Sequence, residues 1–156
     1  GLPNCGKSSL LSVLTRAHPK IANYPFTTLE PNLGVMNSLI IADIPGLIEG
    51  AANGKGLGVK FLKHIEKTKL LLHCIDLESE NISKSYETVL SELKKYNPDL
   101  LQKKQIIVLT KSDLLSKNEI NKKLNVAKKL NKNAYSISIY NKEELSSLKN
   151  LLINLE

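Results

Sequence analysis

The sequence predicts an α/β domain with a mainly parallel sheet, helices on both of its faces and one antiparallel hairpin strand. Three observations lead to this prediction. Apolar runs typical of strands alternate with segments of helical period, a glycine-rich phosphate-loop pattern stands at residues 1–8, and the 156 residues are enough for about one domain. We therefore treat residues 1–156 as a single domain.

The predicted strands are five apolar runs, at residues 33–36, 39–44, 70–75, 106–109 and 134–137. Only Asn37 and Ser38 separate the first two runs, which leaves room for a tight hairpin, so this pair is predicted to be antiparallel. Between the later runs, apolar residues recur at the spacing of one helix face. One such face consists of Ile82, Tyr86, Val89, Leu90 and Leu93, and another of Leu145, Leu148, Leu151, Leu152 and Leu155.

The composition bounds the partners and the compartment. The net charge of +7 is compatible with binding to a polyanion such as ribosomal RNA, although lysines on solvated helix faces explain the charge equally well. No apolar run approaches the roughly 20 residues of a membrane span. The two cysteines, Cys5 and Cys74, lack metal-ligand spacing and indicate a reducing compartment. We expect a cytoplasmic protein, with an organelle as the alternative.

The first chemical motif is the stretch from Gly1 to Ser8, which fits the phosphate-binding pattern G-x-x-x-x-G-K-[ST]. Its glycines let the backbone wrap tightly, so that successive N–H groups point at phosphates from a helix N-terminus. Lys7 would reach the β- and γ-phosphate oxygens, and the Ser8 hydroxyl would bind Mg²⁺. The candidate phosphate-binding residues are Gly1, Asn4, Cys5, Gly6, Lys7, Ser8 and Ser9.

A loop of this type normally follows a buried strand, and none precedes Gly1 in the sequence. We therefore expect that the chain is truncated at this loop. The first strand of the fold, which would lie in the middle of the sheet, is expected to be missing.

Two more motifs follow apolar runs. Asp43 ends one run, where α/β proteins bind ligands, and its carboxylate can hold Mg²⁺ through a water, while the Gly46 N–H can meet a γ-phosphate oxygen. Thr110, Lys111 and Asp113 follow another run. The Asp113 carboxylate can accept hydrogen bonds from guanine N1–H and its amino group, a pair that adenine does not offer, and the Lys111 stem can lie over the base. Together the three motifs favour GTP over ATP.

In these motifs and in three longer stretches, the chain resembles the Obg family of P-loop GTPases. The stretches are GLPNCGKSSL at the start, PKIANYPFTTLEPNLGV at residues 19–35 and ADIPGLIEGAANGKGLGVKFLKHIEKT at residues 42–68. The resemblance implies a P-loop NTPase G domain that binds and hydrolyses GTP with Mg²⁺. It also implies a switch protein in assembly of the large ribosomal subunit, with ribosomal RNA and proteins as partners.

The resemblance also assigns residue roles. Residues 24–28 would form a first switch, in which Thr28, or alternatively Thr27, ligates Mg²⁺ when a γ-phosphate is present, and residues 46–58 would form a second. The base-contacting loop would be Ser138-Ile139, where the usual pattern has Ser-Ala, and the β-branched Ile139 is expected to crowd the base. Thr110 stands where Asn is usual, and its hydroxyl can still tether this motif to the phosphate loop.

Hydrolysis is expected to be slow. Many GTPases carry a Gln that orients the attacking water where this chain has Leu47. Asn4 resembles the Asn of GTPases that use a potassium ion, which makes K⁺ a further candidate cofactor, although a turn-forming role explains Asn4 equally well. Two alternatives remain open: an ATP-binding YchF-like relative, and a nucleotide-gated ribosome- or RNA-binding module with negligible turnover.

Overall fold

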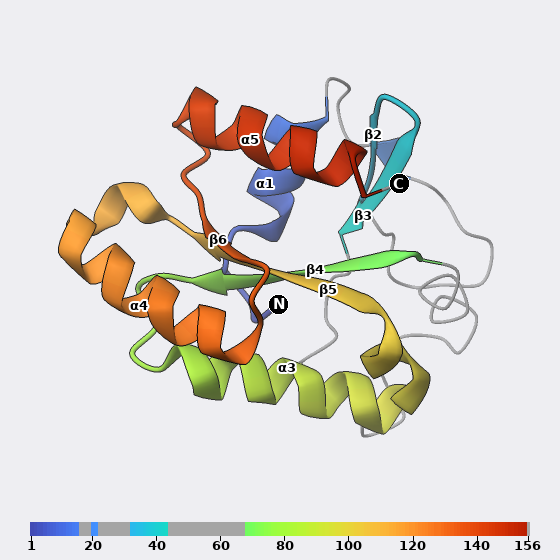
Figure 1. The fold of residues 1–156 in the computed structure, drawn as a ribbon. Coiled ribbons are helices and arrows are strands. Elements are labelled where there is room, and N and C mark those ends of the chain that lie inside the picture. The colour runs from blue at the N-terminus through green and yellow to red at the C-terminus, as the bar shows by residue number, and fades with distance from the viewer. Residues whose placement is uncertain (16–19, 22–31, 44–67, 156) are drawn as a thin grey trace.

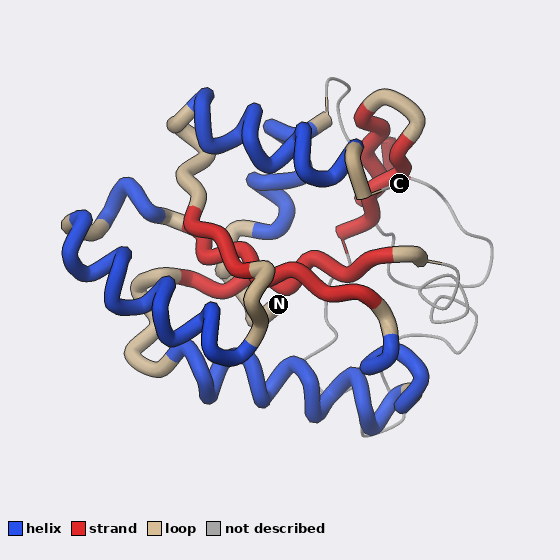
Figure 2. Tube along the Cα trace, in the orientation of Figure 1, coloured by secondary structure: helices blue, strands red, loops and turns tan. Residues whose placement is uncertain are grey.

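The computed structural model describes residues 1–15, 20–21, 32–43 and 68–155, which form a layered α/β fold (Figure 1). Its central sheet contains three parallel strands, β4 (Leu70–Asp76), β5 (Lys104–Thr110) and β6 (Ala134–Ser136). Helices α3 (Ile82–Tyr96) and α4 (Lys117–Leu130) cover one face, and α1 (Lys7–Leu14) and α5 (Lys142–Ile153) lie on the other (Figure 2). The predicted three-layer α/β architecture is confirmed.

Strand β5 lies between β4 and β6 because its sequence can be buried on both faces. Residues 106–110 are at most 3% exposed, and their β-branched and aliphatic side chains suit a pleated, fully packed surface. The parallel register pairs Asp76 with Thr110, and Leu109 with Ser136. The carboxyl ends of all three strands therefore meet at one edge of the sheet, the edge where α/β folds bind ligands.

The helices begin at capping residues and bury their predicted faces. Asn81 caps α3 by accepting a hydrogen bond from the Lys84 N–H, and Ser116 and Glu119 form a capping box at the start of α4. The predicted apolar faces lie on α3 and on the last segment around α5, and their most buried members are Ile82, Val89, Leu93, Leu148 and Leu152. None of the described helices is long and apolar enough to cross a membrane.

A second sheet is antiparallel and contains β1 (Lys20–Ile21), β2 (Asn32–Met36) and β3 (Leu39–Asp43). The predicted hairpin is confirmed, since Met36 pairs with Leu39 and Asn37 takes a left-handed φ of 54° in the turn. Strand β1 was not predicted from the sequence. Residue 44, the last of the predicted strand at 39–44, lies outside the described residues. A Cβ at Gly34 would lie 2.3 Å from the Thr15 side chain, so only glycine allows α1 this close to β2.

A cavity of about 100 Å³ lies between β3 and β4, and within the described residues no strand pairing joins the two sheets. The prediction that a strand of the sheet precedes Gly1 stays a prediction. The cavity wall includes Gly1 and is otherwise mainly apolar, with Leu10, Leu11, Leu14, Ile41, Leu71, Leu72, Val89 and Leu93.

Candidate functional site

The loop of residues 1–6 leads directly into α1 and turns sharply in two places. Asn4 has a φ of 59° and Gly6 a φ of 84°, so both adopt the left-handed conformation. This is the geometry expected of Asn4 as a turn-forming residue. Gly6 is the N-cap residue of α1 and brings no side chain over the helix end. The N–H groups of the first turn are therefore open to an anion.

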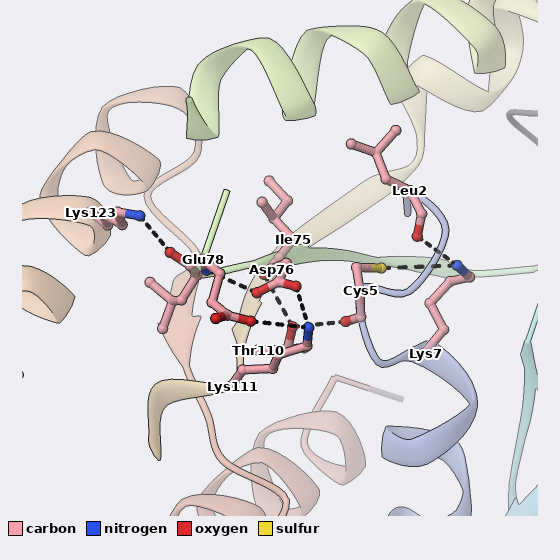
Figure 3. Close-up of polar contacts among 10 residues, drawn as sticks. Leu2, Cys5, Lys7, Ile75, Asp76, Glu78, Thr110, Lys111 and Lys123 are labelled. Carbon is pink, nitrogen blue, oxygen red and sulfur yellow. Dashed lines mark hydrogen bonds and ion pairs between the residues drawn. The ribbon is translucent and has the colours of Figure 1, made fainter. Parts of the chain in front are cut away.

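Lys7 lies folded back over this loop. Its ammonium donates to the carbonyl oxygen of Gly1 at 3.1 Å. It also donates to the carbonyl oxygen of Leu2 at 3.0 Å and lies 3.9 Å from the Cys5 Sγ (Figure 3). All three partners belong to the loop itself. The cation that would meet a bound phosphate is thus held at the mouth of the predicted phosphate site, half-buried.

Ser8 and Asp43, predicted as metal ligands, lie in contact. The Ser8 hydroxyl donates to the Asp43 Oδ2 over 2.5 Å, from the start of α1 to the end of β3. Asp43 is only 6% exposed, and within the described residues its other oxygen, Oδ1, accepts no hydrogen bond. A buried carboxylate oxygen with spare acceptor capacity next to a hydroxyl is the oxygen donor set that Mg²⁺ prefers. These two residues therefore fit a magnesium ion.

No described group of three or more His, Cys, Asp or Glu side chains could hold a metal ion by itself. A magnesium site at Ser8 and Asp43 would thus need further oxygen ligands from phosphate, water or another residue. The other predicted metal ligand, Thr28, lies outside the described residues, as do Thr27, Gly46, Leu47 and both predicted switches.

Thr110 connects three segments at the end of β5. Its hydroxyl lies 2.7 Å from the carbonyl oxygen of Cys5 in the phosphate loop and 3.3 Å from that of Ile75 in β4 (Figure 3). The side chain is 3% exposed. The tether to the phosphate loop that the sequence suggested is therefore present, and it is made by the Thr110 hydroxyl.

Lys111 follows with a strained backbone and an ion pair. Its φ of 62° is unusual for a residue with a Cβ. Its ammonium lies 2.5 Å from the Asp76 Oδ2 and 3.5 Å from the Glu78 Oε2, and the hydrogen bond to Asp76 is the main reason that the pKa of Lys111 is raised. Neither carboxylate was predicted from the sequence as a site residue. Asp76 could have been found from its position at the carboxyl end of the strand beside β5.

Asp113 and Ser138 lie together, as a shared base site requires. The Ser138 hydroxyl donates to the Asp113 Oδ1 over 2.6 Å and accepts the Tyr140 N–H at 3.1 Å. The Ile139 side chain packs against the core cluster around α1 and α5. Whether it also crowds a base stays a prediction. Asp113 is exposed, so its carboxylate is accessible to a ligand.

Glu144 and Ser112, which were not predicted as site residues, help to hold these loops together. The Glu144 Oε2 accepts the Ser138 N–H at 2.7 Å and the Ser112 hydroxyl at 3.2 Å. Ser112 and Ser138 are 7% and 3% exposed, so both hydrogen bonds have buried donors. The role of Glu144 could not be predicted from the sequence, because it lies on α5, six residues after Ser138 and 32 after Ser112, and only the fold brings the three together.

The described candidate residues therefore gather at one edge of the fold. The start of α1 and the ends of β3 and β5 supply the phosphate-loop residues, Asp43 and Thr110, and the segments after β5 and β6 supply Asp113 and Ser138. Ser9 is exposed on the first turn of α1. This arrangement can bind an extended anionic ligand with a polar ring at one end.

Comparisons with known proteins agree with this arrangement. Residues 1–111 match a family model described as 50S ribosome-binding GTPase. The GTPase Obg of Pelagibacter ubique is 50% identical over 99% of this chain and 49% of its own length. The GTPase Obg of Parabacteroides distasonis is 56% identical over 77% of this chain and 32% of its own length. The chain thus spans about half the length, or less, of these relatives.

Solved structures support the same fold. The apo form of translation elongation factor SelB from Methanococcus maripaludis has a TM-score of 0.65 at 22% identity, covering 99% of this chain and 31% of that one. A GDP-bound NFeoB mutant from S. thermophilus has a TM-score of 0.68 at 21% identity, covering 94% of this chain and 57% of that one. At these identities the likeness concerns the fold alone.

Proposed function

The chain belongs to the Obg family of 50S ribosome-binding GTPases, and on that basis we propose that it binds guanine nucleotides and slowly hydrolyses GTP to GDP and phosphate. Residues 1–156 would form one G domain. It would act as a nucleotide-dependent switch in assembly of the large ribosomal subunit, in the cytoplasm, with ribosomal RNA and proteins as partners.

One observation supports this function above the others. The Thr110 hydroxyl holds the Cys5 carbonyl at 2.7 Å, so the motif that would bind the base and the loop that would bind the phosphates form one connected unit. A nucleotide has these two features, base and phosphates, at the two ends of one molecule. A site built for phosphate alone would not need the second motif.

The phosphate end would be bound by the loop and the start of α1. The ammonium of Lys7 would move from the carbonyl oxygens of Gly1 and Leu2 to the β- and γ-phosphate oxygens, a charge-assisted exchange of partners. The N–H groups of the first helical turn would donate to the same phosphates. Ser9, Cys5 and Asn4 would contribute main-chain donors in this arrangement, for which the Cys5 N–H would leave the Leu2 carbonyl.

Ser8 and Asp43 would hold Mg²⁺, joined by Thr28 when a γ-phosphate is present. Bound Mg²⁺ would neutralise charge on the β- and γ-phosphates. The Ser8 hydroxyl would turn its proton away from Asp43, because its oxygen is needed as a ligand. The spare Oδ1 of Asp43 supports this role, since it is buried and has no partner within the described residues.

The base end would be bound by Asp113, Lys111 and the main-chain N–H of Ile139. Asp113 would accept two hydrogen bonds from the guanine edge, which selects guanine over adenine. The stem of Lys111 would lie along the base plane while Asp76 holds its ammonium. Ser138 would orient Asp113 through the hydrogen bond to Oδ1.

In the hydrolytic step, water attacks the γ-phosphorus, and the bond to the oxygen that bridges the β- and γ-phosphates breaks, which releases GDP and phosphate. The Gly46 N–H would donate to a γ-phosphate oxygen. Leu47 cannot orient the water, so the intrinsic rate is expected to be low. Asn4 would hold a potassium ion, which would supply positive charge to the transition state.

A second candidate is a nucleotide-gated binding module with negligible turnover, which Leu47 favours. In that case the GTP-bound form would bind the ribosomal particle and no chemistry would be needed. Single-turnover hydrolysis, measured with and without large-subunit particles, separates the two: a measurable rate in either condition favours the enzyme, and none in both favours the module.

Nucleotide binding itself is tested by competition calorimetry. We expect GTP and GDP to compete for one site while ATP does not. Lys7→Ala should weaken binding of a non-hydrolysable GTP analogue about 100-fold or more, because hydrogen bonds to charged groups are worth about 1.5–3 kcal/mol each. Ser12→Ala, one turn further along α1 and exposed, is the matched control. Equal binding of ATP and GTP would refute guanine specificity and support the YchF-like alternative.

A further inference from the structure

Glu144 lies on the first turn of α5, and its carboxylate points back to the two loops that follow β5 and β6. The Oε2 atom accepts the Ser138 N–H at 2.7 Å and the Ser112 hydroxyl at 3.2 Å. One oxygen atom thus accepts hydrogen bonds from two residues, Ser112 and Ser138, that are 26 positions apart in the sequence. Glu144 therefore joins the loops that would together surround a base.

An ordinary helix cap does not account for this geometry. At the start of α4, Glu119 closes a capping box by accepting the N–H of the N-cap residue Ser116. Glu144 occupies the equivalent third position of α5, but its carboxylate reaches beyond the N-cap to Ser138. The capping of α5 is done by Asn141, whose Oδ1 accepts the N–H groups of Glu143 and Glu144. The carboxylate of Glu144 instead accepts hydrogen bonds from the two loops after β5 and β6.

Ser138 and Ser112, the two residues that donate to Glu144, both affect the position of Asp113. Ser138 donates its hydroxyl to the Asp113 Oδ1, and Ser112 directly precedes Asp113 in the chain. The Ser112 N–H also donates to the Ile137 carbonyl at 3.3 Å. Asp113 is thus held from one side by Ser138 and from the other by Ser112, and both of these are held by Glu144. The position of the Asp113 carboxylate relative to the Ile139 N–H therefore depends on the Glu144 carboxylate.

We propose that Glu144 is a positioning residue for base recognition, which fixes Asp113 and the loop of Ser138 and Ile139 in the relative geometry that a guanine edge requires. This role rests on the proposed function, since it concerns the same site. Two hydrogen bonds to one flat base need both loops in register. A displacement of either loop costs contacts with the base and leaves the phosphate contacts of Lys7 and Ser8 in place.

Two variants separate the effect of the length of the Glu144 side chain from the effect of its charge. Glu144→Gln keeps the length of the side chain and an oxygen that accepts both hydrogen bonds, and it loses the charge. Glu144→Asp keeps the charge at the start of α5 and shortens the side chain by one methylene, so that the oxygens no longer reach Ser138. Glu143→Asp makes the same change one residue earlier, on an exposed side chain, and is the matched control.

The measurement is the dissociation constant for GDP and for IDP, whose base lacks the exocyclic amino group. We expect Glu144→Asp to weaken GDP about 10- to 100-fold and to reduce the preference for GDP over IDP. Glu144→Gln should stay within about threefold of the parent in both quantities. A role limited to helix stability would lower the melting temperature and leave the GDP-to-IDP ratio unchanged.

The outcomes are decisive in each case. If Glu144→Asp matches the parent and Glu143→Asp in the GDP-to-IDP ratio, the positioning role is wrong while guanine binding stands. If Glu144→Gln loses as much as Glu144→Asp, the charge acts and the hydrogen-bonded positioning is wrong. If the parent does not distinguish GDP from ADP, the proposed function fails, and the role of Glu144 fails with it.

Discussion

The Thr110 hydroxyl lies 2.7 Å from the carbonyl oxygen of Cys5, although the two residues are 105 positions apart. Thr110 ends the central strand β5, and Cys5 lies in the loop before α1 (Figure 3). Both residues are at most 3% exposed. Because a buried carbonyl oxygen needs a donor, this hydrogen bond fixes the loop at a set distance from the sheet edge.

Thr110→Val is expected to destabilise the protein and to weaken nucleotide binding. Valine fills the same volume and leaves the Cys5 carbonyl buried without this donor, so the free energy of unfolding should fall by about 1–3 kcal/mol. The dissociation constant for GDP should rise roughly tenfold, since each 1.4 kcal/mol is a factor of ten. Urea unfolding and calorimetry measure the two quantities.

Thr110→Ser is the control, because it keeps the hydroxyl and removes one methyl group. It should bind GDP nearly as tightly as the parent. If Val and Ser at this position give the same GDP affinity, the tether does not contribute to binding.

Asp113→Asn is expected to change the base that the site accepts. The amide replaces an acceptor by a donor, which no longer matches the guanine N1–H and matches the additional carbonyl of xanthine. GDP should bind at least tenfold more weakly, and XDP should bind where the parent does not bind it. Competition against a fluorescent nucleotide measures both. A variant that loses GDP without gaining XDP would place the carboxylate away from the base.

His73 makes the stability depend on pH. This side chain is 4% exposed on β4 with its ring 4.8 Å from that of Tyr86, and burial lowers its pKa to about 3. In the unfolded chain the pKa of histidine is about 6.5, so below that pH the unfolded state binds more protons than the folded state. The lowered pKa of His73 therefore costs no stability above pH 6.5, and the free energy of unfolding falls as the pH drops from 6.5 toward 3.

Well below pH 6.5, the free energy of unfolding is expected to fall by about 1.4 kcal/mol per pH unit, which gives a loss of about 2 kcal/mol at pH 5. His73→Phe keeps a ring against Tyr86 and does not titrate, so this part of the loss should vanish. At pH 7 the variant should be at least as stable as the parent, because within the described residues the buried His73 Nε2 has no hydrogen-bond partner. Urea unfolding at pH 7 and pH 5 checks this. An equal loss in parent and variant would assign the pH dependence to other groups.

The sequence predicted most of the fold because the signals were local. The run at residues 106–109 is apolar throughout, as a strand buried on both faces requires, and Asn37 supplied a turn residue between two short runs. The short strand β1 was missed, because its two residues, Lys20 and Ile21, have no periodic pattern. Its pairing with β2 depends on contacts distant in the sequence.

The phosphate loop, Asp43 and Asp113 could be identified because each belongs to a short motif with a chemical reason for its spacing. Ser112 and Glu144 could not, because their partners come from other elements. Glu144, for example, looks like any acidic residue in a first helical turn until Ser138 is brought beside it. Sequence motifs predicted the residues proposed to touch the ligand, and only the fold reveals those that position them.

The last prediction concerns Asn4, whose φ of 59° sets the first turn of the phosphate loop. The Leu47 side chain cannot orient water, and Lys7 is the cation that the proposed site offers to the charge that develops between the β- and γ-phosphates. A potassium ion held by Asn4 would add a second positive charge there. Electrostatic groups of this kind are worth several kcal/mol in a transition state, or roughly 100-fold or more in rate.

We therefore expect GTP turnover to be faster in potassium than in sodium at equal ionic strength, and Asn4→Ala to lose this difference. Asn4→Gly is the control for the backbone, because glycine adopts the left-handed conformation freely and also lacks the amide. If the amide holds the ion, both variants lose the potassium effect; if only the turn matters, Asn4→Gly keeps it. Equal rates of the parent in the two salts would exclude potassium as a cofactor, and an effect that persists in both variants would place the ion at other residues.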